Sequence, residues 1–197
     1  MNKKEYLEHT KDMYLENLKE NSGGHLSVQW GSKESQYKRF EVLQKIADDF
    51  NESRILDIGC GIGHFWDFIS QNNFQGKYLG IDLLDEMVVQ AKKRHPNVEF
   101  RNINMEKIQA NTFDYLIMSG IFTFANQSIF EKILTDSFHI SQKGIACNVL
   151  STWGRQKEEG EFHADPIKTL EFCSKLTPKV VLRHDYLPHD FTIYMYK

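Results

Sequence analysis

The stretch Arg54–Gly63, which reads RILDIGCGIG, constrains the fold more than any other part of the chain. Its first five residues are mostly apolar and are interrupted by Asp57, which predicts a short buried strand. Three glycines, Gly59, Gly61 and Gly63, follow at alternate positions. Because glycine has no Cβ and tolerates positive φ, such a run lets the backbone approach a ligand closely. The sequence therefore predicts a ligand-binding loop at the end of a buried strand.

Beyond this loop, short apolar runs of strand length alternate with amphipathic helical segments. This alternation predicts an α/β fold with a doubly wound, seven-stranded, mostly parallel sheet covered by helices on both faces. The last two strands are joined by too few residues for a parallel return, so we expect them to pair antiparallel. The expected strands are Arg54–Ile58, Tyr78–Asp82, Val98–Asn102, Phe113–Ser119, Ile145–Leu150, Val180–His184 and Phe191–Tyr196.

Helices are expected between these strands and before the first of them. Those of the sheet region run from about His64 to Gln71, from a cap at Asp85 to His95, from a cap at Asn126, and from Pro166 to about Lys175.

Two further helices should precede the first strand. Residues 2–20 read as an amphipathic helix, and Ser32 is placed to cap a second helix that reaches about Asn51. We divide the chain into an N-terminal helical extension, residues 1–53, and a core, residues 54–197, within one structural domain. The extension is expected to close over the ligand as a lid through Trp30, Ser32, Gln36 and Tyr37.

Composition excludes several classes of partner. The formal net charge of the 197 residues is −3, which gives no general attraction to phosphate backbones, so nucleic acid is disfavoured. The three cysteines, Cys60, Cys147 and Cys173, fit no metal-binding spacing, and no apolar run approaches transmembrane length. We therefore expect a reduced, cytoplasmic protein without a signal peptide, a bound metal or a membrane span.

The sequence of the glycine loop distinguishes between the kinds of nucleotide that such a loop could bind. Gly59 and Gly61 fit the dinucleotide fingerprint Gly-x-Gly-x-x-Gly, but His64 occupies its third glycine position. The chain has no Gly-Lys-Ser/Thr sequence of a phosphate-binding P-loop. A pyrophosphate would also be repelled by the Asp57 carboxylate, whereas a cationic ligand would be attracted to it.

The sequence Asp57-Ile58-Gly59-Cys60-Gly61-Ile62-Gly63 resembles motif I of the Rossmann-like, or class I, S-adenosylmethionine (SAM) methyltransferases. SAM suits a loop with a carboxylate, since it carries a sulfonium and an ammonium and has no phosphate. The resemblance covers about residues 54–197. It implies a sheet with strand order 3-2-1-4-5-7-6, strand seven antiparallel, and SAM as the cofactor.

The same resemblance implies roles for residues along the carboxyl edge of the sheet. An acidic residue at the end of the second strand holds both ribose hydroxyls in this family, and here that residue is Asp82. After the third strand the family often has Asp near adenine, whereas this chain has Asn104. The implied cofactor residues are Asp57, Gly59, Cys60, Gly61 and Gly63 around the methionine and sulfonium, Asp82 at ribose, Leu83, Asn104 and Met105 around adenine, and Ser119 at the methionine part.

The loops after the fourth, fifth and sixth strands should border the methyl acceptor. Histidine is the usual base where an acceptor must lose a proton, and His189 and His163 are the first and second candidates, although a histidine in a hairpin or on a polar loop is more often a solvated or capping residue. The place after the fourth strand reads Ser119-Gly120-Ile121-Phe122 and lacks the Asn/Asp-Pro-Pro-aromatic motif of methyltransferases that act on base or glutamine nitrogens. The expected acceptor is therefore a small molecule.

Two other functions stay open for the sequence. A methyltransferase core without an acceptor pocket would be a non-catalytic SAM-binding or partner-regulating domain. A nicotinamide-linked oxidoreductase is the third possibility, and His64 in the place of a glycine disfavours it.

Overall fold

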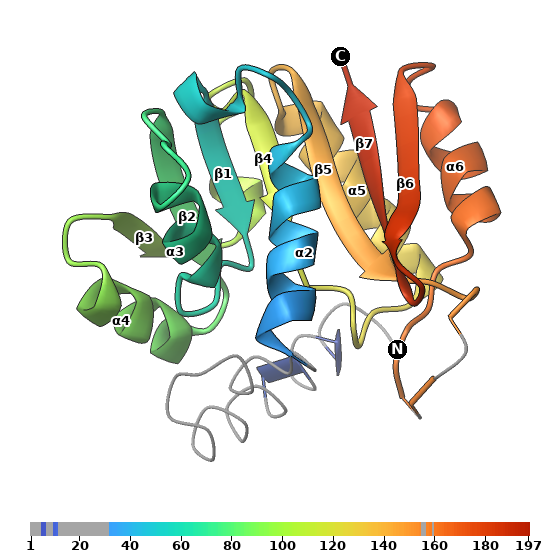
Figure 1. The fold of residues 1–197 in the computed structure, drawn as a ribbon, viewed down its shortest axis with the longest axis horizontal. Helices are drawn as coiled ribbons and strands as arrows, with labels where there is room; N and C mark the ends of the chain where they lie inside the picture. The colour runs from blue at the N-terminus through green and yellow to red at the C-terminus, as the bar shows by residue number, and fades with distance from the viewer. Residues whose placement is uncertain (1–4, 7–9, 12–31, 155–156, 159) are drawn as a thin grey trace.

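The computed structural model describes residues 5–6, 10–11, 32–154, 157–158 and 160–197 of the chain. Seven strands form one sheet in the order β3-β2-β1-β4-β5-β7-β6 (Figure 1), which confirms the predicted topology. Strand β7 runs antiparallel to β5 and β6, and the other neighbours are parallel. The strands are Arg54–Ile58 (β1), Lys77–Asp82 (β2), Glu99–Asn102 (β3), Tyr115–Met118 (β4), Gly144–Leu150 (β5), Val180–Leu187 (β6) and Asp190–Tyr196 (β7).

Helices cover both faces of the sheet, with α2 in front and α5 behind in Figure 1. Side chains alternate along each strand, so Ile55 and Ile117 face α2 and α3, whereas Leu56 and Met118 face α5. The two layers of packed side chains form the core. The helices are Lys33–Gln44 (α2), His64–Ser70 (α3), Asp85–Arg94 (α4), Gln127–Ile140 (α5) and Pro166–Ser174 (α6), with 3₁₀ turns at Phe50–Glu52 (η2) and Met105–Lys107 (η3).

Helix α2 ends at Gln44, so the prediction of a helix to about Asn51 is wrong beyond that residue. The chain has to turn toward β1 while it keeps Ile46 and Phe50 buried. The Ile46 carbonyl accepts a hydrogen bond from the Tyr196 hydroxyl at 2.7 Å, and the Phe50 amide bonds instead to the Ala47 carbonyl in the 3₁₀ pattern. Tertiary contacts therefore override the local helical pattern.

Several of the other boundaries differ from the prediction by one or two residues, and two differences have a clear structural cause. Asp85 is the first residue of α4 and not its cap, because Leu84 holds the extended cap position and donates its amide to Asp82 Oδ1. Strand β6 continues three residues past His184, to Leu187, because a register irregularity between Arg183 and Leu187 lets the strand pair almost up to the turn. By contrast, the predicted caps of α2 and α5 at Ser32 and Asn126 are confirmed, and the Asp165 side chain caps α6.

Helix α2 is fastened to the sheet at several points. The Tyr194 hydroxyl donates to the Val42 carbonyl at 2.5 Å, and Arg39 Nε lies 2.6 Å from Asp190 Oδ2 in a buried ion pair. The expected helix over residues 2–20 lies mostly outside the described residues, as does Trp30, but residues 5–6 and 10–11 are helical. In the part of the chain that the structure describes, no helix has the length and apolar character needed to cross a membrane.

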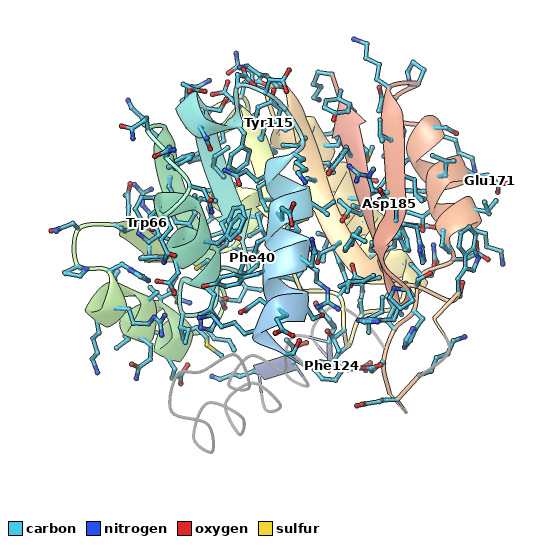
Figure 2. All side chains as sticks on the ribbon, in the orientation of Figure 1. Phe40, Trp66, Tyr115, Phe124, Glu171 and Asp185 are labelled. Carbon is cyan, nitrogen blue, oxygen red and sulfur yellow. The ribbon has the colours of Figure 1, made fainter. Side chains whose placement is uncertain are left out.

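The carboxyl ends of β1, β2 and β4 meet at one edge of the sheet, where α2 begins (Figure 1). In Figure 2, Tyr115 at the start of β4 marks the opposite edge, and Phe124, in the turn after β4, marks the carboxyl edge. This is the edge where open α/β sheets bind ligands.

Candidate cofactor and acceptor site

A cavity of about 580 Å³ lies at the carboxyl edge of the sheet. Its walls come from the glycine loop, the end of β2, the turn after β4, the first turns of α2 and the outer face of α5. The described N-terminal residues Tyr6 and Lys11 also contribute. The Tyr6 side chain is buried, and its hydroxyl donates to the Ile121 carbonyl at 2.6 Å, which ties the N-terminal segment to the turn after β4. One cavity therefore connects the predicted cofactor residues with the N-terminal elements.

The glycine loop needs glycine for its shape. Gly59, Gly61 and Gly63 have φ values of 74°, 52° and 89°, which residues with a Cβ rarely adopt. A Cβ on Gly59 would lie 2.2 Å from Ile121 Cγ2. The amides of Gly59 and Cys60 both donate to the Ile81 carbonyl, at 2.8 and 3.0 Å, so the loop is joined to the end of β2.

Asp57 lies beneath this loop with 2% of its surface exposed. The Tyr78 hydroxyl donates to its Oδ2 at 2.7 Å. Burial raises the pKa of Asp57 to about 7, and the charge of nearby Asp82 acts in the same direction. A cationic group placed beside Asp57 would favour its ionised form, because an opposite charge stabilises a carboxylate. Asp57 is thus suited to the cationic ligand that the sequence predicts.

Asp82 joins the loop to α4. Its Oδ2 accepts from the Gly61 amide and its Oδ1 from the Leu84 amide, both at 2.9 Å. Burial raises the pKa of Asp82, and these backbone amides oppose that rise. Each carboxylate oxygen accepts more than one hydrogen bond, so Asp82 retains the capacity to accept from two vicinal hydroxyls.

The residues predicted to surround adenine and methionine line the cavity, with the exception of Gly63. The apolar side chain of Leu83 is 49% exposed, and a flat ring stacked on it would cover this surface. Asn104 Oδ1 already accepts from the Glu106 amide at 3.1 Å, because Asn104 caps η3. Ser119 Oγ lies 3.4 Å from Asn148 Oδ1, a buried side chain of β5.

The structure brings His163 and His189 near each other but places neither among the described residues that line the cavity. His163 Nε2 lies 3.1 Å from Glu161 Oε2, and its Nδ1 lies 3.3 Å from the Ser151 carbonyl. His189 lies in the β6–β7 turn against Gly154, where burial and then the charge of Arg39 lower its pKa. The catalytic assignment of these two histidines stays a prediction.

Of the histidines in the described residues, His64 alone lines the cavity. Its Nδ1 lies 3.3 Å from Nε2 of Gln36, a cavity-lining residue that is 2% exposed. From the sequence, His64 was expected to stand in place of a glycine at the start of a helix, and Gln36 was expected to belong to a lid. Neither residue was predicted to bind the cofactor. The position of His64 directly after Gly63 was a usable signal, whereas nothing local to Gln36 places it beside the loop.

The donor and acceptor groups fit the expected cofactor. A buried carboxylate, a half-buried carboxylate, a loop of positive-φ glycines and an exposed apolar side chain suit a ligand with cationic groups, vicinal hydroxyls and a flat ring. Within the described ranges, no group of three or more His, Cys, Asp or Glu side chains is placed to hold a metal ion.

Comparison with known proteins agrees with this geometry. A profile of the methyltransferase-domain family matches residues 55–144. The Mycobacterium tuberculosis protein Rv1506c, named as a methyltransferase, is 31% identical over 164 residues, which span 77% of this chain and 95% of that protein. A tRNA (guanine-N(7)-)-methyltransferase of Clostridium kluyveri is 40% identical over 77 residues, 36% of each chain. The crystal structure of magnesium protoporphyrin IX methyltransferase from Synechocystis PCC 6803 with bound SAH covers 100% of both chains, with a TM-score of 0.68 and 9% identity.

Proposed function

Because this chain belongs to the class I SAM-dependent methyltransferases, we propose that its methyl acceptor is a small molecule that binds in the same cavity as the cofactor. The observation that carries this proposal is the roof of the cavity. Buried Tyr6 and Phe40 line it from the N-terminal side, and the Tyr6 hydroxyl bonds to the turn after β4. A small acceptor fits a cavity of about 580 Å³ that buried side chains cover in part, whereas a polymer would need a longer groove.

Charge supports the same acceptor class. The chain carries a net charge of −3, and the carboxylates of Asp57 and Asp82 are among the groups that line the cavity. A nucleic acid would bring its phosphates toward these carboxylates, which repel them. Carboxylates also release no counterions from the nucleic acid, and that release is what drives nucleic-acid binding. The relative named for tRNA matches only 36% of this chain, so its acceptor does not transfer by similarity.

The residues of the cavity supply alignment and exclusion of water. When bound, SAM would supply a methyl group attached to a cationic sulfur. The acceptor would form a bond to the methyl carbon, in line with the carbon–sulfur bond that breaks. Asp57 would balance positive charge at the methionine end, and Asp82 would fix the ribose, so that the sulfur faces the turn containing Ser119 and Ile121. The apolar side chains of Phe40 and Ile121 keep water out, which strengthens the electrostatic interactions around the reacting atoms.

The acceptor class is tested by measuring SAH formation with fractionated cell extract. The purified protein is incubated with SAM and a small-molecule filtrate, total RNA or the protein fraction in parallel. SAH formation that depends on the filtrate supports the proposal. SAH formation that depends on RNA would contradict it, and SAM binding without turnover in any fraction would favour the non-catalytic alternative.

A further inference from the structure

We propose that Gln36 and His64 together bind the α-carboxylate of SAM and thereby attach α2 to the cofactor. This proposal rests on the chain using SAM and is independent of the acceptor. The two side chains come from different elements, since Gln36 lies in the first turns of α2 and His64 opens α3. They meet across the cavity wall, with Gln36 Nε2 3.3 Å from His64 Nδ1.

The position of Asp57 indicates on which face of the sheet the methionine end of SAM lies. Asp57 alternates with Ile55 along β1, so its side chain points to the face that α2 and α3 cover. The ammonium and the carboxylate of SAM are attached to one carbon. If the ammonium lies near Asp57, the carboxylate must therefore find its partners within a few ångströms on the same face.

A carboxylate inside the cavity requires hydrogen-bond donors, because burial without them is costly. Lys132 also lines the cavity, but it belongs to α5 on the other face of the sheet and pairs with Asp136 at 2.7 Å. Gln36 and His64 are side-chain donors that line the cavity on the Asp57 face.

The hydrogen-bond capacity of the pair matches a carboxylate. The Gln36 amide nitrogen carries two protons, and only one of them can lie along the line to His64 Nδ1. When Nδ1 accepts that proton, the ring proton of neutral His64 resides on Nε2, which makes His64 a donor as well. Two N–H groups from adjacent side chains can then engage the two oxygens of one carboxylate.

This assignment gives α2 a direct role in cofactor binding. The family profile begins at residue 55, so Gln36 lies outside the region that the motif-based comparison covers. Binding of SAM would connect the glycine loop, through the carboxylate, to a helix that also carries cavity-lining Phe40. Cofactor binding would therefore hold one wall of the acceptor space in place.

The test uses three ligands that differ in one group at a time. SAH has the carboxylate and the ammonium, S-adenosyl-3-thiopropylamine lacks only the carboxylate, and 5′-methylthioadenosine lacks both. Dissociation constants are measured by calorimetry for the wild-type protein, Gln36→Leu and His64→Phe. Gln44→Leu is the matched control, because Gln44 lies at the far end of α2 and bonds to Asn51.

Each of the two variants should weaken SAH binding about 10-fold or more, the loss typical of a hydrogen bond to a charged group. The affinity for the two ligands without a carboxylate should change less than about twofold, and Gln44→Leu should change none of the affinities. Equal losses for SAH and the decarboxylated ligand, or no loss at all, would overturn the proposal.

Gln36→Glu keeps the size of the side chain and guards against a folding defect. This substitution should weaken the binding of SAH more than that of the decarboxylated ligand, because the new carboxylate would repel the carboxylate of SAH. Retained affinity for SAH would count against the assignment. If the wild-type protein bound neither SAH nor SAM, the SAM-dependent function would fail. Tight SAH binding that the variants leave unchanged would remove only the present proposal.

Discussion

Two carboxylates, the buried Asp57 and the half-buried Asp82, dominate the chemistry of single residues in this protein. They lie at the ends of adjacent strands, and both have pKa values raised by burial. Their environments differ, because Asp82 accepts two backbone amides whereas Asp57 accepts the Tyr78 hydroxyl. We therefore expect Asp82 to orient the cofactor and Asp57 to respond to its charge.

Replacement of Asp82 by alanine should weaken SAM binding by about 1–3 kcal/mol, because the ribose hydroxyls would lose their acceptors. Calorimetric titration with SAM measures the change. Asp185→Ala is the control, since Asp185 is an exposed residue paired with Arg183 on β6. An unchanged affinity in Asp82→Ala would refute the ribose assignment.

The raised pKa of Asp57 makes the stability of the ligand-free protein depend on pH. The folded pKa is about 7 and the ordinary value is 3.8, so the folded state holds a proton that the unfolded state releases. The free energy of unfolding should therefore fall as pH rises from about 4 to about 7, by roughly 4 kcal/mol at most. Asp57→Asn should lose this part of the pH dependence. Urea unfolding at several pH values measures it, and identical pH profiles for both proteins would contradict the account.

The residues that we expect to bind the cofactor could be identified from the sequence because they follow local motifs. Asp57, Asp82 and the glycines sit at fixed offsets from strand ends, and all of them line the cavity except Gly63. Gly63 instead begins α3 with a positive φ and no room for a Cβ beside His95. The partner of His64 was not predictable, because the contact with Gln36 joins residues 28 positions apart.

Among the elements, the glycine loop and α2 form the walls of the site. The loop fits tightly under the turn after β4, since a Cβ on Gly59 would meet Ile121 Cγ2 at 2.2 Å. Helix α2 covers the sheet from the other side and contributes Phe40 and Leu43 to the core. The shape of the site thus depends on packing between these elements as well as on the motif.

Gly59→Ala should destabilise the fold by more than Gly160→Ala. Both glycines have positive φ, 74° and 88°, but a Cβ on Gly160 would have no neighbour within 4 Å. Gly160→Ala thus measures the backbone strain alone, about 1–3 kcal/mol, and Gly59→Ala adds the clash with Ile121. Thermal unfolding compares the two variants. Equal destabilisation would show that the contact with Ile121 is unimportant.

The errors in the predicted ends of helices and strands come from tertiary contacts. Helix α2 was predicted to run too far because its sequence lacks a glycine or proline stop, while the Tyr196–Ile46 hydrogen bond ends it in the structure. Strand β6 was predicted too short because its extension depends on an irregular pairing with β7. Neither contact leaves a local sequence signal.

In the molecule as a whole, a buried ion pair joins helix α2 to the C-terminal hairpin of β6 and β7. Arg39 on α2 pairs with Asp190 at the start of β7, and both side chains are buried. Asp190 Oδ1 also accepts from the Tyr186 hydroxyl at 2.5 Å. The pair lies outside the described residues that line the cavity, but it holds α2, which carries cavity-lining Gln36 and Phe40, against the sheet.

Arg39→Met should destabilise the protein by about 3–5 kcal/mol, because Asp190 would remain buried without its ionic partner. Lys38→Met is the control, since Lys38 is the exposed neighbour on α2 and forms an exposed ion pair with Glu41. Urea unfolding measures both variants. The double variant Arg39→Met/Asp190→Asn should recover part of the loss, and a loss no larger than that of Lys38→Met would contradict a structural role for the pair.

The central claim is that SAM lies over the carboxyl edge of the sheet, between the glycine loop and the turn after β4. A crystal structure of the protein with SAH tests this claim most directly. It should show the ribose hydroxyls on Asp82, the amino acid end of SAH on the Asp57 face, and the sulfur toward Ser119. A ligand bound elsewhere, or with its ribose away from Asp82, would contradict the account.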